Sequence, residues 1–108
     1  MQNRGCGKNA RSGNFVTIGA LQLDLLIPGA QSLKDKRRVI KSLKERLHNR
    51  FNCSVAEIDF QDTWRRSRLA VCIIGNDVRH VNSQLSSVVA YVAANSAAEL
   101  ADYRIEML

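Results

Sequence analysis

Hydrophobic and polar residues alternate along four stretches of the chain and recur with helical spacing along two others. The alternating positions predict four strands, over residues 15–27, 54–61, 67–75 and 101–108. Apolar residues three and four positions apart predict two helices, over residues 32–50 and 77–95. The start of the first helix is marked by Ser32 with Asp35 three residues later, a variant of the capping box in which Asp replaces Glu. The predicted order of elements is therefore βαββαβ.

This order predicts an α/β (α+β) fold. Right-handed crossovers arrange it as a two-layer ferredoxin-like βαββαβ sandwich, in which a four-stranded antiparallel sheet carries two helices on one face. We expect the first and third strands to be inner, parallel neighbours. Alternation in the second strand sets Ala56, Ile58 and Phe60 opposite Glu57, Asp59 and Gln61.

The sheet face without helices is expected to be charged. Its expected residues are Gln22, Asp24, Glu57, Asp59, Arg66, Arg68 and Arg104. Charges that alternate across neighbouring strands are typical of cross-strand pairs rather than of acid–base catalysis. We therefore expect no catalytic residues on this face.

Composition divides the chain into a tail and a domain. Residues 1–14 (MQNRGCGKNARSGN) have no apolar periodicity and predict a disordered basic tail, while residues 15–108 form one ferredoxin-like domain. Hydrophobic residues make up 45% of the chain, which is enough for one core. No apolar run approaches the roughly 20 residues of a membrane span, so a membrane partner is not expected.

The cysteines and histidines carry no spacing typical of a metal site. Cys6, Cys53 and Cys72 form no CxxC pair, and His48 and His80 lie on different predicted helices. Reduced cysteines in apolar runs are typical of a cytoplasmic protein. We expect neither a metal ion nor a cofactor.

The net charge is concentrated on the first predicted helix. Residues 33–50 carry eight cations and two anions, a net +6 that equals the formal charge of all 108 residues. At about 100° per residue, five of the cations share an arc about 120° wide: Lys34, Arg37, Arg38, Lys41 and Lys44. Like charges four residues apart cost a few tenths of a kcal/mol each, a repulsion that an anionic partner relieves. A neutral body with one cationic helix indicates a polyanion such as nucleic acid, although a solvated helix face is the simpler alternative.

Two further features near this helix are candidate contacts. The turn that ends in Ser32 leads to the positive end of the helix and, with Lys34, either holds a single anion or is a plain strand-to-helix turn. Trp64 lies beside Arg65 and Arg66, where it either stacks on a base or closes the core or a subunit contact. If the cationic helix binds nucleic acid, Arg65 and Arg66 would add a second, auxiliary basic patch.

Three stretches together resemble the YlxP-like family of small, uncharacterised bacterial proteins. They are Ile27-Pro28-Gly29-Ala30-Gln31-Ser32-Leu33-Lys34-Asp35-Lys36-Arg37-Arg38, Asn49-Arg50-Phe51-Asn52-Cys53-Ser54-Val55-Ala56-Glu57, and Gln61-Asp62-Thr63-Trp64. The resemblance covers about residues 15–108 and implies a ferredoxin-like fold. Members of that family are often encoded near genes for translation initiation and ribosome maturation, which implies RNA or a ribosomal particle as partner. The resemblance supplies no catalytic residue.

These observations lead us to expect a non-catalytic, cytoplasmic RNA- or ribosome-associated protein. Its basic first helix would bind phosphates. One alternative is a regulator or enzyme that binds a small anion at the turn between the first strand and the first helix. The other is a structural homo-oligomer that associates through the sheet face or an edge strand.

Overall fold

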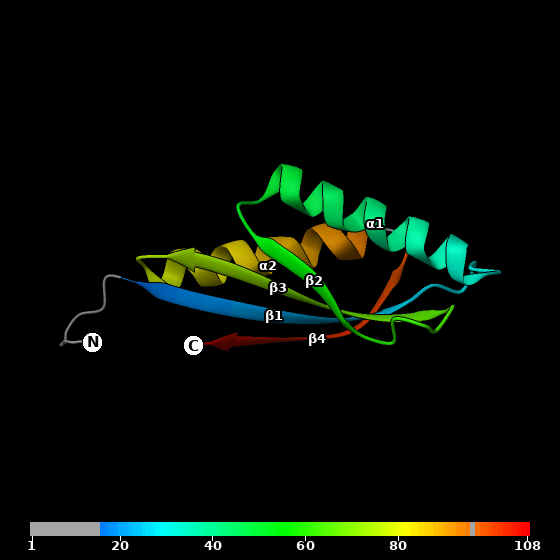
Figure 1. Ribbon diagram of the computed structural model, residues 1–108. Coiled ribbons are helices and arrows are strands. Elements are labelled where there is room, and N and C mark those ends of the chain that lie inside the picture. The colour runs from blue at the N-terminus through cyan, green and yellow to red at the C-terminus, as the bar shows by residue number, and fades with distance from the viewer. Residues whose placement is uncertain (1–15, 96) are drawn as a thin grey trace.

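The computed structural model describes residues 16–95 and 97–108, so the tail predicted over residues 1–14 lies outside the described residues. Two helices and four strands follow one another in the predicted order (Figure 1). They are β1 (Thr17–Leu26), α1 (Leu33–Arg50), β2 (Ser54–Asp59), β3 (Arg66–Gly75), α2 (Val78–Asn95) and β4 (Glu99–Met107). Every predicted boundary lies within two residues of the observed one, which confirms the predicted βαββαβ arrangement.

The four strands form one antiparallel sheet in the order β2-β3-β1-β4. As predicted, β1 and β3 are inner neighbours, but the prediction that they run parallel is wrong: Thr17 pairs with Gly75 and Leu26 with Arg66. The crossover through α1 makes β2 run in the same direction as β1, and the tight β2–β3 turn then reverses the chain. Therefore β3 is antiparallel to β1.

Both helices cover the same face of the sheet (Figure 1), so the predicted two-layer ferredoxin-like sandwich is confirmed. Helix α1 lies over β2, and α2 packs across β1, β3 and β4. Leu21, Leu23 and Leu25 of β1 meet Leu43 of α1 and Leu85 of α2 in one buried core. Neither helix in the described part of the chain is long and apolar enough to cross a membrane.

The absence of a side chain at Gly19 lets α2 approach β1 closely. A Cβ atom at Gly19 would lie 2.7 Å from Leu85 Cδ1 and 2.7 Å from Val81 Cγ1, closer than carbon atoms can pack. A Cβ atom at Gly75, on the neighbouring strand β3, would lie 2.8 Å from Val81 Cγ2. The two glycines therefore form the depression into which Val81 fits, and they set the distance between α2 and the sheet.

Ala56 and Glu57 of β2 face opposite ways from the predicted arrangement, whereas Asp59 lies on the predicted face. Ala56 is exposed, whereas Glu57 pairs in register with the buried Leu69 and points to the helix side, so the expectation of Glu57 on the open face is wrong. The alternation misled because the half-buried Glu57 pairs with the buried Lys36 instead of facing water. A register shift between Glu57 and Asp59 then returns Asp59 to the open face, opposite Arg68.

Arg68 links three strands on the open face. Its guanidinium donates from Nε to Asp24 Oδ1 of β1 at 2.5 Å and from Nη1 to Asp59 Oδ2 of β2 at 3.4 Å. The hydrogen bond to Asp24 is the main reason why the pKa of Arg68 is raised above its ordinary value. The charges here thus form cross-strand pairs.

Candidate nucleic-acid interface

Helix α1 begins at a well-formed cap. The Ser32 side chain accepts a hydrogen bond from the backbone N–H of Asp35 at 3.0 Å, and the Asp35 carboxylate accepts one from the N–H of Gln31 at 3.1 Å. The predicted capping-box variant is therefore present, with the acidic side chain reaching Gln31 instead of Ser32 itself. Because the Asp35 carboxylate occupies the positive end of the helix, this turn is poorly suited to a second, free anion.

The five predicted cations of α1 follow the side of the helix away from the core. The buried side is formed by Lys36, Ile40, Leu43 and Leu47. The cationic face is Lys34, Arg37, Arg38, Lys41 and Lys44, of which only Lys44 is half-buried and the others are exposed. Over its 18 residues the helix is about 27 Å long, enough to follow several phosphates.

Few anions neutralise this cationic face. Arg37 lies 3.7 Å from Asp62 and Arg38 lies 3.5 Å from Asp35, and both arginine side chains are more than 60% exposed. Exposed pairs of this kind contribute about 0–1 kcal/mol and are readily exchanged for other partners. The remaining members, which are all lysines, form no ion pair with any residue that the structure describes. The face is therefore a cationic surface that is only partly neutralised, by two exposed ion pairs.

Lys36 is a buried cation of α1 whose ammonium group is bound entirely within the protein. Its side chain is 0% exposed, and Nζ lies 2.8 Å from Glu57 Oε2. Nζ also donates to the carbonyl oxygens of Phe60 at 2.7 Å and Gln61 at 3.3 Å, so that all three of its protons have acceptors. The same Glu57 oxygen accepts a hydrogen bond from Ser67 Oγ. Lys36 therefore fastens α1 to the β2–β3 turn.

From the sequence, Lys36 was expected to be one of the eight cations of the first helix, with no separate role. A signal was present, because at 100° per residue Lys36 falls on the same side of the helix as Ile40, Leu43 and Leu47. A lysine on an apolar helix face needs a buried acceptor. No acceptor for Lys36 could be chosen from the sequence, because Glu57 stood in the same alternation as Asp59 and Gln61.

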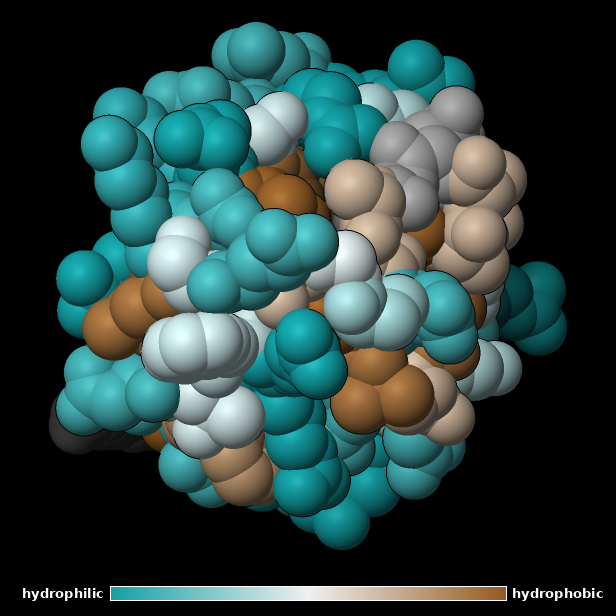
Figure 2. All heavy atoms as spheres, turned by 90° about the vertical axis from the view of Figure 1, so that its right-hand side faces the viewer, coloured by the Kyte–Doolittle hydropathy of each residue, from teal (hydrophilic) through white to brown (hydrophobic). Residues whose placement is uncertain are grey.

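The β2–β3 turn brings the predicted auxiliary cations next to the start of α1. Arg65 donates from Nε to the carbonyl of Ala30 at 3.0 Å, and Arg66 lies 4.1 Å above the Phe60 ring. Trp64, the candidate stacking residue, is 50% exposed. Figure 2, which faces this end of the molecule, shows mainly hydrophilic surface with separate hydrophobic patches. The turn and the cationic face thus lie at adjoining places on the surface.

Phe60 shapes this turn with an uncommon backbone conformation. Its φ of 61° lies in the left-handed region, which costs a non-glycine residue of order 1–3 kcal/mol. Its carbonyl accepts hydrogen bonds from both Lys36 Nζ and the Thr63 N–H. These two bonds hold the turn in the strained form.

No group of three or more histidine, cysteine, aspartate or glutamate side chains in residues 16–95 and 97–108 gathers closely enough to hold a metal ion.

Burial raises the pKa of the Cys53 thiol above its ordinary value. That thiol donates to the carbonyl of Leu47 at 3.7 Å. A buried, protonated thiol packs as a small hydrophobic group rather than acting as a nucleophile.

The fold and surface are those of a small α+β domain with a cationic helix. The chain belongs to the family described as "Protein of unknown function (DUF503)", which it matches over residues 18–105. It is 35% identical over 75 residues to the uncharacterised protein YlxP of Bacillus subtilis (strain 168), covering 69% of this chain and 82% of that protein. The predicted membership of a YlxP-like family is thereby confirmed. The designed protein Ferredog-Diesel is similar in structure with a TM-score of 0.46 at 14% identity, over 98% of both chains.

Proposed function

We propose that this protein is a non-catalytic, cytoplasmic RNA- or ribosome-associated protein that binds phosphates through helix α1. The observation that carries the proposal is the cationic face of Lys34, Arg37, Arg38, Lys41 and Lys44, whose lysines have no anionic partner among the described residues. Five neighbouring cations repel one another without contributing to the fold. Phosphates would relieve that repulsion and release counterions on binding.

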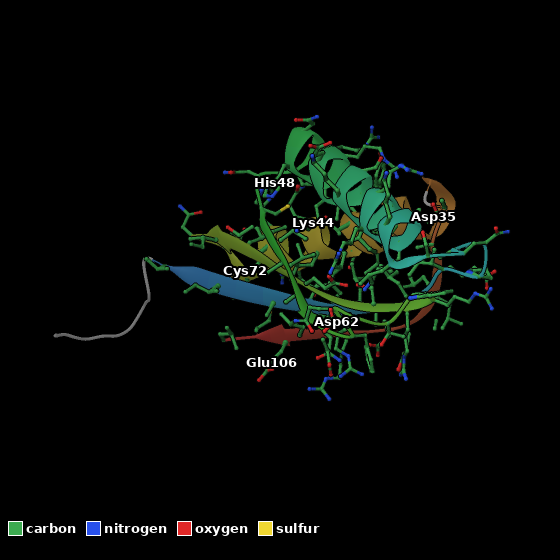
Figure 3. All side chains as sticks on the ribbon, turned by 45° about the vertical axis from the view of Figure 1, so that its right-hand side comes forward. Asp35, Lys44, His48, Asp62, Cys72 and Glu106 are labelled. Carbon is green, nitrogen blue, oxygen red and sulfur yellow. The ribbon has the colours of Figure 1, made fainter. Side chains whose placement is uncertain are left out.

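The distribution of charge between the helices and the sheet also supports binding of a polyanion through the helix side of the molecule. The two helices together carry nine cations and two anions, a net +7, because α2 has no acidic residue and contributes Arg79. The described residues outside the helices carry four cations and eight anions, a net −4. Figure 3 illustrates this arrangement, with Lys44 and His48 on α1 and Glu106 on the other side of the sheet. A polyanion is therefore attracted to the helix layer and repelled by the sheet layer.

The experiment that tests the proposal is a titration of structured RNA at several salt concentrations, with the double variant Arg37→Glu, Lys41→Glu. Both side chains are exposed and lie outside the core, so the variant should fold with an unchanged melting temperature. Each lost phosphate contact should lower the slope of log affinity against log salt by roughly 0.7 to 0.9. Replacing a cation by an anion should act at least as strongly.

The matched control is Arg104→Glu, an exposed residue of the edge strand β4, which should change affinity much less. Equal affinity and equal slope for the wild type and the double variant would remove α1 from any binding role. A shallow slope in both would instead favour the alternative of a single small anion. A molar mass in solution above that of one chain would favour the homo-oligomer.

A further inference from the structure

A groove lies between the C-terminal end of α1 and the outer side of α2. It has a volume of about 630 Å³, and it is lined by Arg50, Phe51, Gln84, Ser87, Ala90 and Tyr91. That volume is within the range of roughly 300–1,000 Å³ that small-ligand sites occupy. Arg50 and Phe51 belong to one of the three stretches that resemble the YlxP-like family, but no sequence pattern joined them to the residues of α2.

The groove is on the other flank of α1 from the Arg37 side. Arg37 faces Asp62 of the β2–β3 turn, whereas Arg50 faces Tyr91 of α2. Along the helix axis, Arg50 lies six residues beyond Lys44, which is about 9 Å at 1.5 Å per residue. A polyanion that follows the cationic face must therefore pass around the C-terminal end of α1 to place a base in the groove.

One side of the groove is an edge-to-face aromatic pair with an arginine over one ring. The Tyr91 and Phe51 rings meet edge to face with centroids 6.1 Å apart and planes at 77°, and both side chains are half-buried. The guanidinium carbon of Arg50 lies 5.0 Å from the centroid of the Tyr91 ring. Unpaired bases stack on aromatic rings and on arginine planes alike, so this layer is a ready platform for one base.

The α2 side of the groove also offers hydrogen-bonding groups, one and two turns before Tyr91 on the same face of the helix. Ser87 donates its hydroxyl proton to the carbonyl of Ser83 at 3.0 Å, which leaves its oxygen as an acceptor. The half-buried Gln84 amide makes no hydrogen bond to another described residue, and it offers both donors and an acceptor. A carboxylate is absent from the six lining residues, so an anionic ligand meets no repulsion there.

We propose that this groove binds one unpaired base of a single-stranded or looped RNA, stacked on Arg50 and Tyr91 and contacted at its edge by Gln84 and Ser87. This proposal rests on the proposed function and adds its substrate class. A duplex keeps its bases stacked and paired, so it cannot place one in the groove. Helix α1 would then recognise phosphates of either form, and the groove would select the unpaired form.

The test compares two probes on the full chain by fluorescence anisotropy: a short RNA strand, and the same strand annealed to its complement. Tyr91→Leu should weaken binding of the single strand about 5- to 150-fold, the worth of one stacked base, and leave duplex affinity and the salt slope unchanged. Tyr91→Phe, which keeps the ring, is the matched control and should bind both probes as the wild type does. Gln84→Leu, which leaves the aromatic pair intact, should also weaken only the single strand.

The outcomes separate this inference from the proposed function. If Arg37→Glu, Lys41→Glu weakens both probes while Tyr91→Leu and Gln84→Leu weaken neither, the groove is not a base site and the proposed function stands. Should the double variant have no effect on either probe, the proposed function fails and takes this inference with it. If Tyr91→Leu lowers the melting temperature, the Gln84→Leu variant decides the test. If Gln84→Leu then binds the single strand as tightly as the wild type does, the proposal is overturned.

Discussion

Replacing Lys36 by Met should destabilise the domain more than any other single lysine substitution on α1. Met keeps the apolar length of the side chain but removes the ion pair with Glu57 and the hydrogen bonds to Phe60 and Gln61. The Glu57 carboxylate, 16% exposed, then retains only the Ser67 hydroxyl. Breaking a buried pair by removing one partner costs about 3–5 kcal/mol.

That cost is large compared with the stability of a small domain, about 5–15 kcal/mol. In a domain of this size each kcal/mol lowers Tm by about 4–8 °C, so Lys36→Met should lower Tm by at least about 12 °C. Urea unfolding followed by circular dichroism measures the free energy directly. Lys41→Met, at an exposed position of the same helix, is the matched control and should change stability by under about 0.5 kcal/mol.

A double-mutant cycle with Glu57→Gln separates the ion pair from the burial of the lysine stem. The double variant should lose less free energy than the sum of the two single variants, because Lys36→Met no longer leaves a charged partner buried. The reasoning is refuted if Lys36→Met costs no more than Lys41→Met, or if the effects of the two substitutions are additive. Either result would mean that Lys36 is solvated and is one of the surface cations.

Three smaller predictions follow from the packing. Gly19→Ala should destabilise the domain by roughly 1–3 kcal/mol, since its Cβ atom would overlap Val81 and Leu85, and Val81→Ala should recover part of that loss in a melting experiment. Leu43→Ala should cost about 2–5 kcal/mol in urea unfolding because the side chain is 0% exposed; a loss below 1 kcal/mol would contradict its place in the core. Cys53 should react with iodoacetamide more slowly than free cysteine, because burial raises its pKa above 9.0. The stabilisation by its protonated form is present below the ordinary thiol pKa and is lost as pH rises through the raised pKa, so a Cys53→Ala variant should lose less stability than the wild type over that rise in pH.

Local patterns sufficed to predict the elements and their layering, but they did not predict which way β2 faces. Alternation treats every charge as solvated, so it placed Glu57 outside with Asp59, whereas the Lys36 ammonium makes the inner position favourable. That pairing joins residues 21 positions apart and depends on how α1 lies over β2, which no local pattern contains. The cap at Ser32 was predictable because all its atoms come from four consecutive residues.

Part of the candidate binding surface could also be predicted from the sequence, and part could not. The cationic face follows from helical spacing alone, since every member belongs to α1. The groove beside Tyr91 could not be predicted, because Arg50 meets that ring only after both helices have packed on the sheet. Arg65 was predicted as a basic contact, but its bond to the Ala30 carbonyl shows that it also ties two turns together.

The separation of charge between the two layers gives the molecule a preferred orientation before any contact forms. With positive charge on the helices and negative charge on the sheet, a nearby polyanion exerts a torque that turns the helix layer toward it. Encounters would then begin with α1 in front, and added salt would slow association by weakening that alignment as well as the attraction. If the proposed binding holds, the same rotation would leave the uncovered face of the sheet, with Arg68 and its carboxylate partners, directed away from the polyanion.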